Sequence, residues 1–233
     1  MKKSLIALAV LAAAGAASAQ SSVTLYGIAD AYVGSVKSAL ADSSKKSQTS
    51  VNSSGLSNSR WGLMGSEDLG NGLKANFVLE SGFNTDDGSQ AKTASGTQGA
   101  TEARQFGRKA TVGLSGSFGN VDLGRDYTAY DSIRTLVNNT GDTNASITNT
   151  VFAAGTGYKA DGTVFKSRDY TNRTDNSIRF DSAVYSGFSG AVAYAFGENK
   201  ATGKDATNTA SLHVKYVNGP LAAAYAHQSE KQE

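Results

Sequence analysis

Residues 73–83 read LKANFVLESGF, and every second position from 73 to 83 is apolar except Ser81. The positions between them hold Lys74, Asn76 and Glu80. A period of two residues is typical of a β-strand, because successive side chains of a strand point to opposite faces of its sheet. The stretch therefore predicts a strand with one apolar face and one charged face.

The same alternation recurs along the chain and predicts nine strands. They cover residues 23–33, 59–67, 73–83, 106–116, 120–127, 176–186, 188–197, 211–217 and 221–227. Short connections, at 68–72, 117–120, 186–190 and 218–220, alternate with long ones, at 34–58, 84–105, 128–175 and 198–210. Strict alternation of short and long connections is typical of an antiparallel barrel in an asymmetric membrane.

The composition excludes several classes of protein. The 233 residues include 26 Gly, one Pro and no Cys, so a disulfide framework, a thiolate zinc site and a cysteine nucleophile are excluded. Basic residues number 22 and acidic residues 20, with no long run of one sign, so nothing indicates a nucleic-acid partner. No spacing of His, Asp and Ser indicates a catalytic group, and we expect no enzyme activity, no cofactor and no metal.

The first 19 residues have the features of a Sec-type signal peptide. Lys2 and Lys3 precede the apolar stretch 5–17, and residues 17–19 form the small-residue cleavage site Ala-Ser-Ala. We expect cleavage after Ala19, which divides the chain into a signal peptide, 1–19, and an exported portion, 20–233. No later apolar run approaches the ~20 residues that a membrane-spanning helix needs.

Alternation alone fits both a soluble β-sandwich and a membrane β-barrel, because both have one apolar face. The export signal and strands of a length that suits a tilted membrane strand favour the barrel. Aromatic residues near predicted strand ends also favour it, since such residues form girdles at membrane interfaces. These residues are Trp61, Phe83, Phe106, Tyr127, Phe188, Phe196 and Tyr216.

Several motifs together resemble the Gram-negative general porins of the β-proteobacterial type. Residues 22–27 read SVTLYG, and residues 59–75 read SRWGLMGSEDLGNGLKA, which is the most specific block. Residues 118–125 read FGNVDLGR, and NSI at 176–178 is followed by GFS at 187–189. The matches extend from about residue 20 to about residue 227 in the order of the family's strands.

The resemblance implies a 16-stranded transmembrane antiparallel β-barrel in the cell outer membrane, which assembles as a homotrimer. Its partners would be the lipid bilayer, lipopolysaccharide, and the small hydrophilic solutes and ions that diffuse through a water-filled pore. The third external loop of such a barrel folds inward and narrows the pore. The longest predicted connection, 128–175, is the candidate for this constriction loop.

The resemblance also implies basic residues on the pore wall that face acidic residues of the constriction loop. The wall candidates are Arg60, Arg125, Arg173, Lys74 and Arg179. Alternation turns Arg60, Lys74 and Arg179 inward, whereas Arg125 shares the parity of Val121 and Leu123 and needs a bend or bulge to point inward. The acidic candidates in the loop are Asp131, Asp142, Asp161 and Asp169. The loop also carries basic residues, so we expect a weak preference for anions.

Two alternatives remain: a secreted or surface β-structured adhesin, and a barrel enzyme, for which we find no clustered catalytic residues. A barrel of 16 strands needs roughly 300 residues. We therefore interpret residues 20–233 as the N-terminal portion of an incomplete barrel, and we expect this portion alone to form no heat-modifiable trimer.

Overall fold

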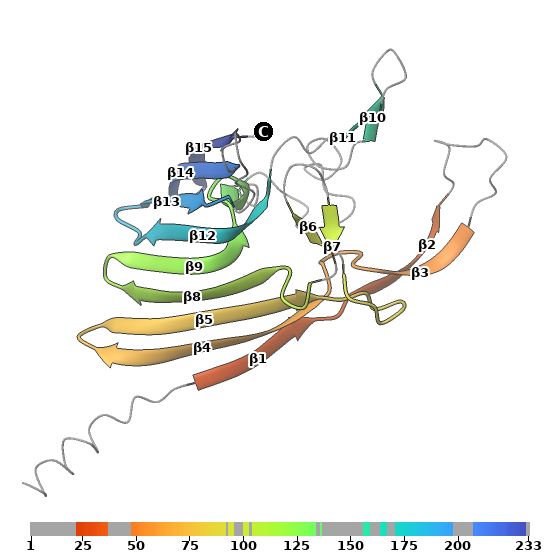
Figure 1. Cartoon of the computed structure of the whole chain (residues 1–233), viewed down its shortest axis with the longest axis horizontal. Coiled ribbons are helices and arrows are strands. Elements are labelled where there is room, and N and C mark those ends of the chain that lie inside the picture. The colour runs from red at the N-terminus through yellow and green to blue at the C-terminus, as the bar shows by residue number, and fades with distance from the viewer. Residues whose placement is uncertain are drawn as a thin grey trace, which may run out of the picture.

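Nine antiparallel strands form the main sheet of the computed structural model (Figure 1). The structure describes residues 22–36, 48–91, 93–95, 100–102, 104–133, 136, 156–158, 164–166, 171–197 and 207–231. Each strand of the sheet pairs with the next strand in chain order. The strands are β1 (Ser22–Ile28), β4 (Arg60–Gly70), β5 (Leu73–Gly82), β8 (Lys109–Gly116), β9 (Gly119–Tyr127), β12 (Arg173–Ser182), β13 (Phe188–Ala195), β14 (Asn208–Asn218) and β15 (Leu221–Lys231).

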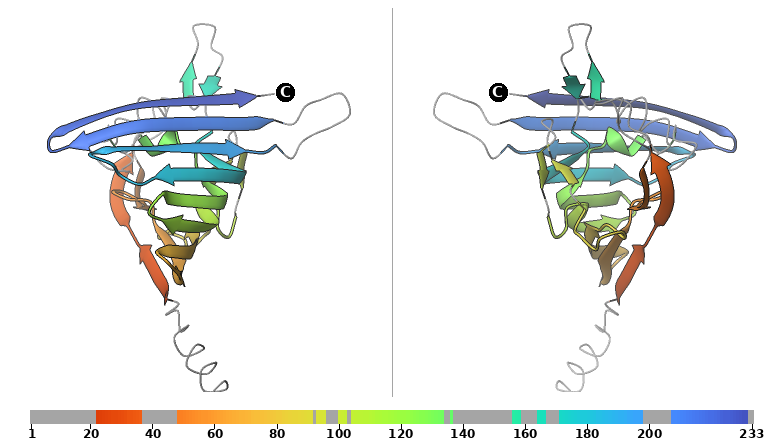
Figure 2. Two further views of the ribbon diagram at one scale, coloured as in Figure 1. Left: turned by 90° about the vertical axis from the view of Figure 1, so that its left-hand side faces the viewer. Right: turned by 90° about the vertical axis from the view of Figure 1, so that its right-hand side faces the viewer.

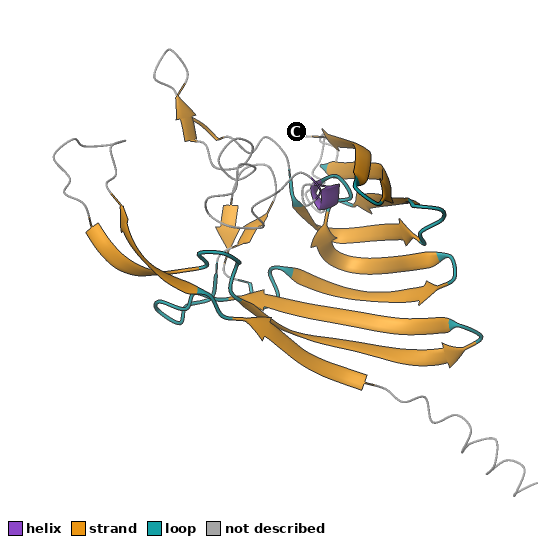
Figure 3. Cartoon of the chain, turned by 180° about the vertical axis from the view of Figure 1, so that it is seen from behind, coloured by secondary structure: helices purple, strands orange, loops and turns teal. Residues whose placement is uncertain are grey.

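Each of the nine predicted strands has a counterpart in the main sheet, with some bounds changed, and the alternation of their connections is confirmed. Tight turns join β4 to β5, β8 to β9, β12 to β13 and β14 to β15 at one end of the sheet (Figures 1 and 3). The long connections leave from the other end. The predicted loop 128–175 is three residues shorter than expected, because β12 already begins at Arg173.

Shorter elements extend the long connections. They are the hairpin of β2 (Ala31–Val36) with β3 (Gln48–Ser53), the pair β6 (Thr93–Ser95) with β7 (Ala100–Glu102), the pair β10 (Thr156–Tyr158) with β11 (Val164–Lys166), and the 3-10 helix η1 (Asp131–Ile133). No helix in the described part of the chain is both long and apolar enough to cross a membrane.

The predicted first strand, 23–33, is interrupted at Asp30. The Asp30 carboxylate accepts hydrogen bonds from the backbone N–H groups of Ser57, Leu56 and Gly55, at 2.7, 2.8 and 3.0 Å. Its carbonyl accepts one from the Thr85 hydroxyl, at 2.7 Å. Asp30 therefore joins three chain segments at the long-loop end, and the strand ladder stops there.

The sheet curls so that η1 lies on its concave side (Figure 2). Apolar side chains cover the outer, convex face; Leu25 is 70% exposed, Val112 58% and Val214 54%. In the described residues, the buried hydrophobic set comprises four alanines, of which Ala191, Ala193 and Ala195 lie on β13. By contrast, 17 polar or charged residues in the same described part of the chain are buried. This distribution is the reverse of that in a water-soluble protein, which buries its large apolar side chains.

Aromatic residues lie near both ends of the outer face. Phe188 and Tyr216 stack at 4.6 Å near the short turns, and Trp61 meets Phe106 edge-on at 6.1 Å near the long loops. Tyr127 does not join them, contrary to the sequence-based expectation. Its ring packs instead under the Arg173 guanidinium, 3.8 Å from the ring centre.

Candidate functional site

Basic side chains gather on the inner face of the sheet, near the long-loop end. Arg60 begins β4 and donates from Nη1 to Ser57 Oγ at 3.2 Å and to the Asn58 carbonyl at 2.9 Å. Glu80 of β5 lies between two arginines: its Oε2 is 3.5 Å from Arg60 Nε, and its Oε1 is 2.7 Å from Arg108 Nε. One carboxylate thus serves two guanidinium groups.

Lys109 continues the cluster along β8, directly opposite Glu80 in the strand register. Its ammonium group lies 2.7 Å from Asp126 and 3.6 Å from Asp122, both on the inner face of β9. The two carboxylates are nearly buried, with 8% of each side chain exposed. A charge at this depth interacts more strongly with its partner than a charge on an open surface.

Arg125 keeps the parity of Leu123 in β9, because it lies opposite Ala110 in an unbroken β8–β9 register, but it is buried. The β9–β12 register shifts between Thr174 and Ser177, which is a β-bulge, and Gly124 has a φ of 126° that favours glycine. Arg125 donates from Nε to the Gly107 carbonyl at 2.7 Å and pairs with Asp175 at 2.5 Å. Asp175 lies at the bulge and also pairs with Arg104 at 2.6 Å, so it joins the two arginines.

Arg173 lies beside Arg125 but is held differently. It donates from Nε to the Arg108 carbonyl at 3.0 Å, contacts the Tyr127 hydroxyl, and stacks on the Tyr127 ring. Among the described residues, no carboxylate lies within ion-pair distance of Arg173. Its charge is stabilised by a cation–π contact and by carbonyl dipoles, and it adds to the positive potential of the wall.

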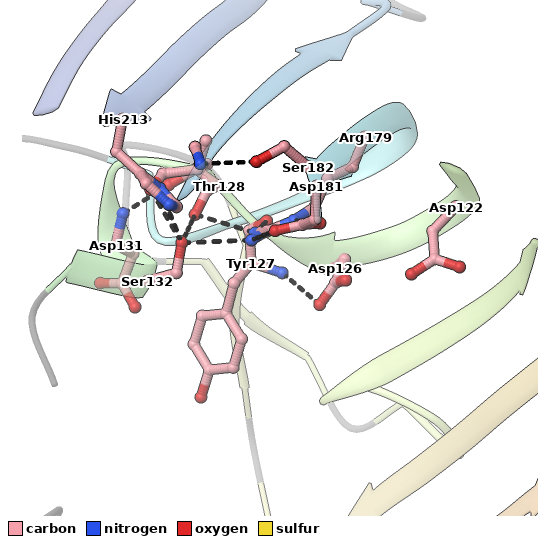
Figure 4. A network of polar contacts seen from close by, with 12 residues as sticks. Asp122, Asp126, Tyr127, Thr128, Asp131, Ser132, Arg179, Asp181, Ser182 and His213 are labelled. Carbon is pink, nitrogen blue, oxygen red and sulfur yellow. Dashed lines mark hydrogen bonds and ion pairs between the residues drawn. The ribbon is translucent and has the colours of Figure 1, made fainter. Parts of the chain in front are cut away.

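Arg179 connects the wall to the segment that follows β9 (Figure 4). It forms a two-pronged ion pair with Asp181, with both distances 2.7 Å. Its Nη1 donates to the carbonyls of Tyr127 and Thr128, at 2.8 and 3.3 Å, and its Nη2 donates to Ser132 Oγ at 3.3 Å. The start of the long loop therefore turns inward onto the charged face.

The remaining predicted site residues are not all brought to this cluster. Lys74 lies at the short-turn end of β5, exposed, six residues from Glu80. At ~3.3 Å per residue this separation is about 20 Å. Asp131 is buried at the start of η1, where its N–H donates to Thr128 Oγ1 at 3.1 Å. Asp142, Asp161 and Asp169 lie outside the described residues.

Sequence reasoning missed several members of the cluster. Arg108 had the wrong parity for a strand starting at residue 106, but β8 begins at Lys109, and Arg108 lies just before it with its N–H donating to the Glu80 carbonyl at 3.2 Å. The carboxylates that pair with the basic residues of the wall were expected on the loop. Those that the structure shows lie on the wall strands: Glu80, Asp122, Asp126, Asp175 and Asp181. Alternation placed Glu80 and Asp181 on the polar face but could not identify their partners.

Among the residues that the structure describes, the cluster carries a basic excess. In the described residues, six basic side chains pair with these five carboxylates, and Arg173 lies beside them without an ion pair; the six are Arg60, Arg104, Arg108, Lys109, Arg125 and Arg179. Asp131 lowers the excess without removing it. No group of three or more His, Cys, Asp or Glu side chains in the described residues could hold a metal ion. A charged inner face opposite an exposed apolar face defines the chain as part of the wall of a membrane β-barrel.

Comparison with known proteins agrees with this class. The family model of Gram-negative porins matches residues 5–233, and the chain belongs to that family. It is 41% identical to outer membrane porin protein 32 of Delftia acidovorans over 99% of this chain and 60% of the relative. It is 37% identical to an outer membrane porin protein of Bordetella pertussis, over 97% of this chain and 59% of the relative. The chain thus spans about 60% of the length of these curated relatives.

One solved porin structure is also similar to this chain. The anion-selective porin from Comamonas acidovorans aligns with a TM-score of 0.65 and 33% identity, over 90% of this chain and 57% of that one. The alignment agrees with the fold described above.

Proposed function

We propose that the chain forms part of the wall of an outer-membrane channel through which small hydrophilic solutes and ions diffuse passively. The observation that carries this proposal is the opposition of the two faces of the sheet. Leu25, Val112 and Val214 are exposed on the outer face, while Arg108, Lys109 and Arg179 gather on the inner one. Lipid tails would cover the first face, and water would fill the space beside the second.

The preference of the channel would follow from the charges on its wall. A low-dielectric wall concentrates the field of fixed charges on a passing ion, so a basic excess raises the local concentration of anions. The Comamonas acidovorans porin, at 33% identity, is named as anion-selective. We therefore propose a weak anion preference, with the inner cluster as its source. In this function the residues bind and steer solutes and carry out no catalysis.

We propose for this chain the membrane location and the oligomeric state that are typical of the porin family. The outer face would contact the outer-membrane bilayer and lipopolysaccharide, and the channel would assemble as a homotrimer. Residues 1–19, as a cleaved signal peptide, would provide export. The loop 128–172, whose first residues turn inward at Arg179, would narrow the lumen, with Asp131, Asp142, Asp161 and Asp169 as candidate acidic residues.

Planar-bilayer recordings from channels whose wall includes this chain test the proposal. We expect stepwise conductance. In a KCl gradient, the reversal potential should lie between zero and the equilibrium potential of chloride. A clear preference for potassium would contradict the selectivity. Recovery of the protein from the aqueous fraction without detergent would contradict the channel itself and favour a secreted adhesin.

A further inference from the structure

The long loop between β9 and β12 is closed at its base. The Thr128 N–H donates to the Asn172 carbonyl at 3.0 Å, so the two ends of the loop lie side by side. Each end then makes a second set of contacts with the inner face of the hairpin formed by β14 and β15. These contacts involve side chains of the wall and the main chain of the loop.

The first end is held through both main-chain polar groups of Ala129. The Ala129 N–H donates to Ser211 Oγ at 3.0 Å, and its carbonyl accepts from His213 Nδ1–H at 2.7 Å. Ser211 and His213 are two positions apart on β14, so they point to the same face. Ala129 has no exposed surface at all. Figure 4 shows His213 directed at this segment.

The second end is held in the same manner through Thr171. Its N–H donates to Glu230 Oε1 at 2.5 Å, and its carbonyl accepts from Gln228 Nε2 at 2.8 Å. Gln228 and Glu230 are also two positions apart on one strand, β15. The Gln228 Oε1 atom is buried and has no hydrogen-bond partner within the described part of the molecule. Leaving a buried acceptor unpaired has a cost, which indicates that the amide is oriented by the loop.

The two contacts lie next to each other on the wall. Ser211 and Gln228 are direct partners in the β14–β15 register. Small side chains on the adjacent strand, Ala191 and Ala193, leave room for Ala129 against the sheet. Because all four contacts are made to main-chain groups of the loop, they fix its path whatever side chains it carries.

We infer that the β14–β15 hairpin is the docking platform of the long loop. Ser211 and His213, together with Gln228 and Glu230, are positioning residues. They hold the two ends of residues 128–172 against the wall and thereby set the width of the lumen beside the basic cluster. The consequence for permeation rests on the proposed channel function, whereas the docking itself does not.

Protection of a single thiol measures the docking directly. The chain has no Cys, so A129C introduces a unique thiol at a site with no exposed surface. Its reaction with a water-soluble maleimide in membranes reports the fraction of time that the loop is undocked. In the A129C background, S211A with Q228L removes one hydrogen bond at each end without changing any charge. Labelling is expected to rise on the order of 30-fold, the effect of losing two hydrogen bonds.

Matched control variants distinguish the loss of loop docking from a general loss of barrel stability. S229A makes the same chemical change on the outer face of β15, and S211T keeps a hydroxyl; both are expected to label like A129C alone. Equal labelling of A129C with and without S211A/Q228L would overturn the platform.

Channel recordings without the A129C change test the consequence. S211A/Q228L is expected to raise open-channel noise and to shift the reversal potential relative to S229A. Faster labelling with unchanged permeation would overturn the positioning role. Failure of the channel proposal would appear instead as absent conductance in S229A.

Discussion

Single residues decide how the charges of the wall are distributed. Glu80 contacts two arginines and also accepts from the Tyr26 hydroxyl at 3.1 Å, so it neutralises charge at a point where three strands meet. Arg173 stacks on an aromatic ring without a carboxylate among the described residues. The sequence predicted which residues are charged and, mostly, which face they occupy. It could not predict the pairs, because these depend on the register between strands.

Replacing Glu80 should increase the anion preference. E80Q removes one negative charge from the cluster and leaves Arg60 and Arg108 less neutralised. The reversal potential in a KCl gradient should move further toward that of chloride. E67Q, the same change at an exposed position of β4, is the control and should leave it unchanged. A shift of E80Q toward cation preference would contradict the assignment of the cluster.

Asp30 should make the long-loop end of the sheet sensitive to acid. Hydrogen bonds from the Ser57, Leu56 and Gly55 N–H groups hold the pKa of the Asp30 carboxyl below its usual value. Its stabilising contribution is thus fully present above the unfolded pKa of about 3.9. It is lost as the pH falls through the lower pKa of the folded state.

D30N should therefore speed cleavage of segment 54–58 by a non-specific protease at pH 7, and the difference from the parent should disappear below the folded pKa. D87N is a suitable control, because Asp87 accepts hydrogen bonds from the N–H and the hydroxyl of Ser89, two residues away. Equal cleavage of D30N and the parent at neutral pH would show that Asp30 does not hold the segment.

At the scale of strands, the alternation of residues predicted the main sheet, and local backbone geometry produced the exceptions. The bulge between Thr174 and Ser177 holds Asp175, the partner of Arg125, and Gly124 beside Arg125 has a positive φ; neither feature can be read from alternation. The β2–β3 hairpin was missed because its second strand, QTSVNS, consists mainly of polar residues that resemble a loop. The end of the first strand at Asp30 depends on contacts with residues distant in sequence.

The β8–β9 pair should be sensitive to a methyl group at Gly124. A Cβ there would meet the Ala110 carbonyl in the neighbouring strand, and the φ of 126° is unfavourable for other residues. G124A is expected to lower the free energy of unfolding by about 2 kcal/mol or more. G72A, which has a positive φ but open space around the new methyl group, should cost only about 1 kcal/mol. Urea titrations in lipid vesicles would measure both, and equal losses would contradict the role of the close approach.

At the scale of the whole molecule, the opposition of the two faces of the sheet is the central feature. The same alternation fits a soluble sandwich, so the sequence left that choice open. The structure favours the barrel wall, because the large apolar side chains are exposed and the buried hydrophobic residues of the described chain are four alanines. The family assignment agrees with this distribution.

Accessibility of single cysteines in outer-membrane vesicles tests this claim most directly. Adjacent residues of β14 provide one matched pair, Val214 on the outer face and Lys215 on the inner face. Neighbouring strands provide another, Leu25 on β1 and Met64 on β4. Fluorophores attached at V214C and L25C should be quenched by lipid-borne nitroxides, while K215C and M64C should react with a water-soluble thiol reagent. Aqueous labelling of both members of each pair, with no quenching by lipid, would contradict the assignment of the two faces.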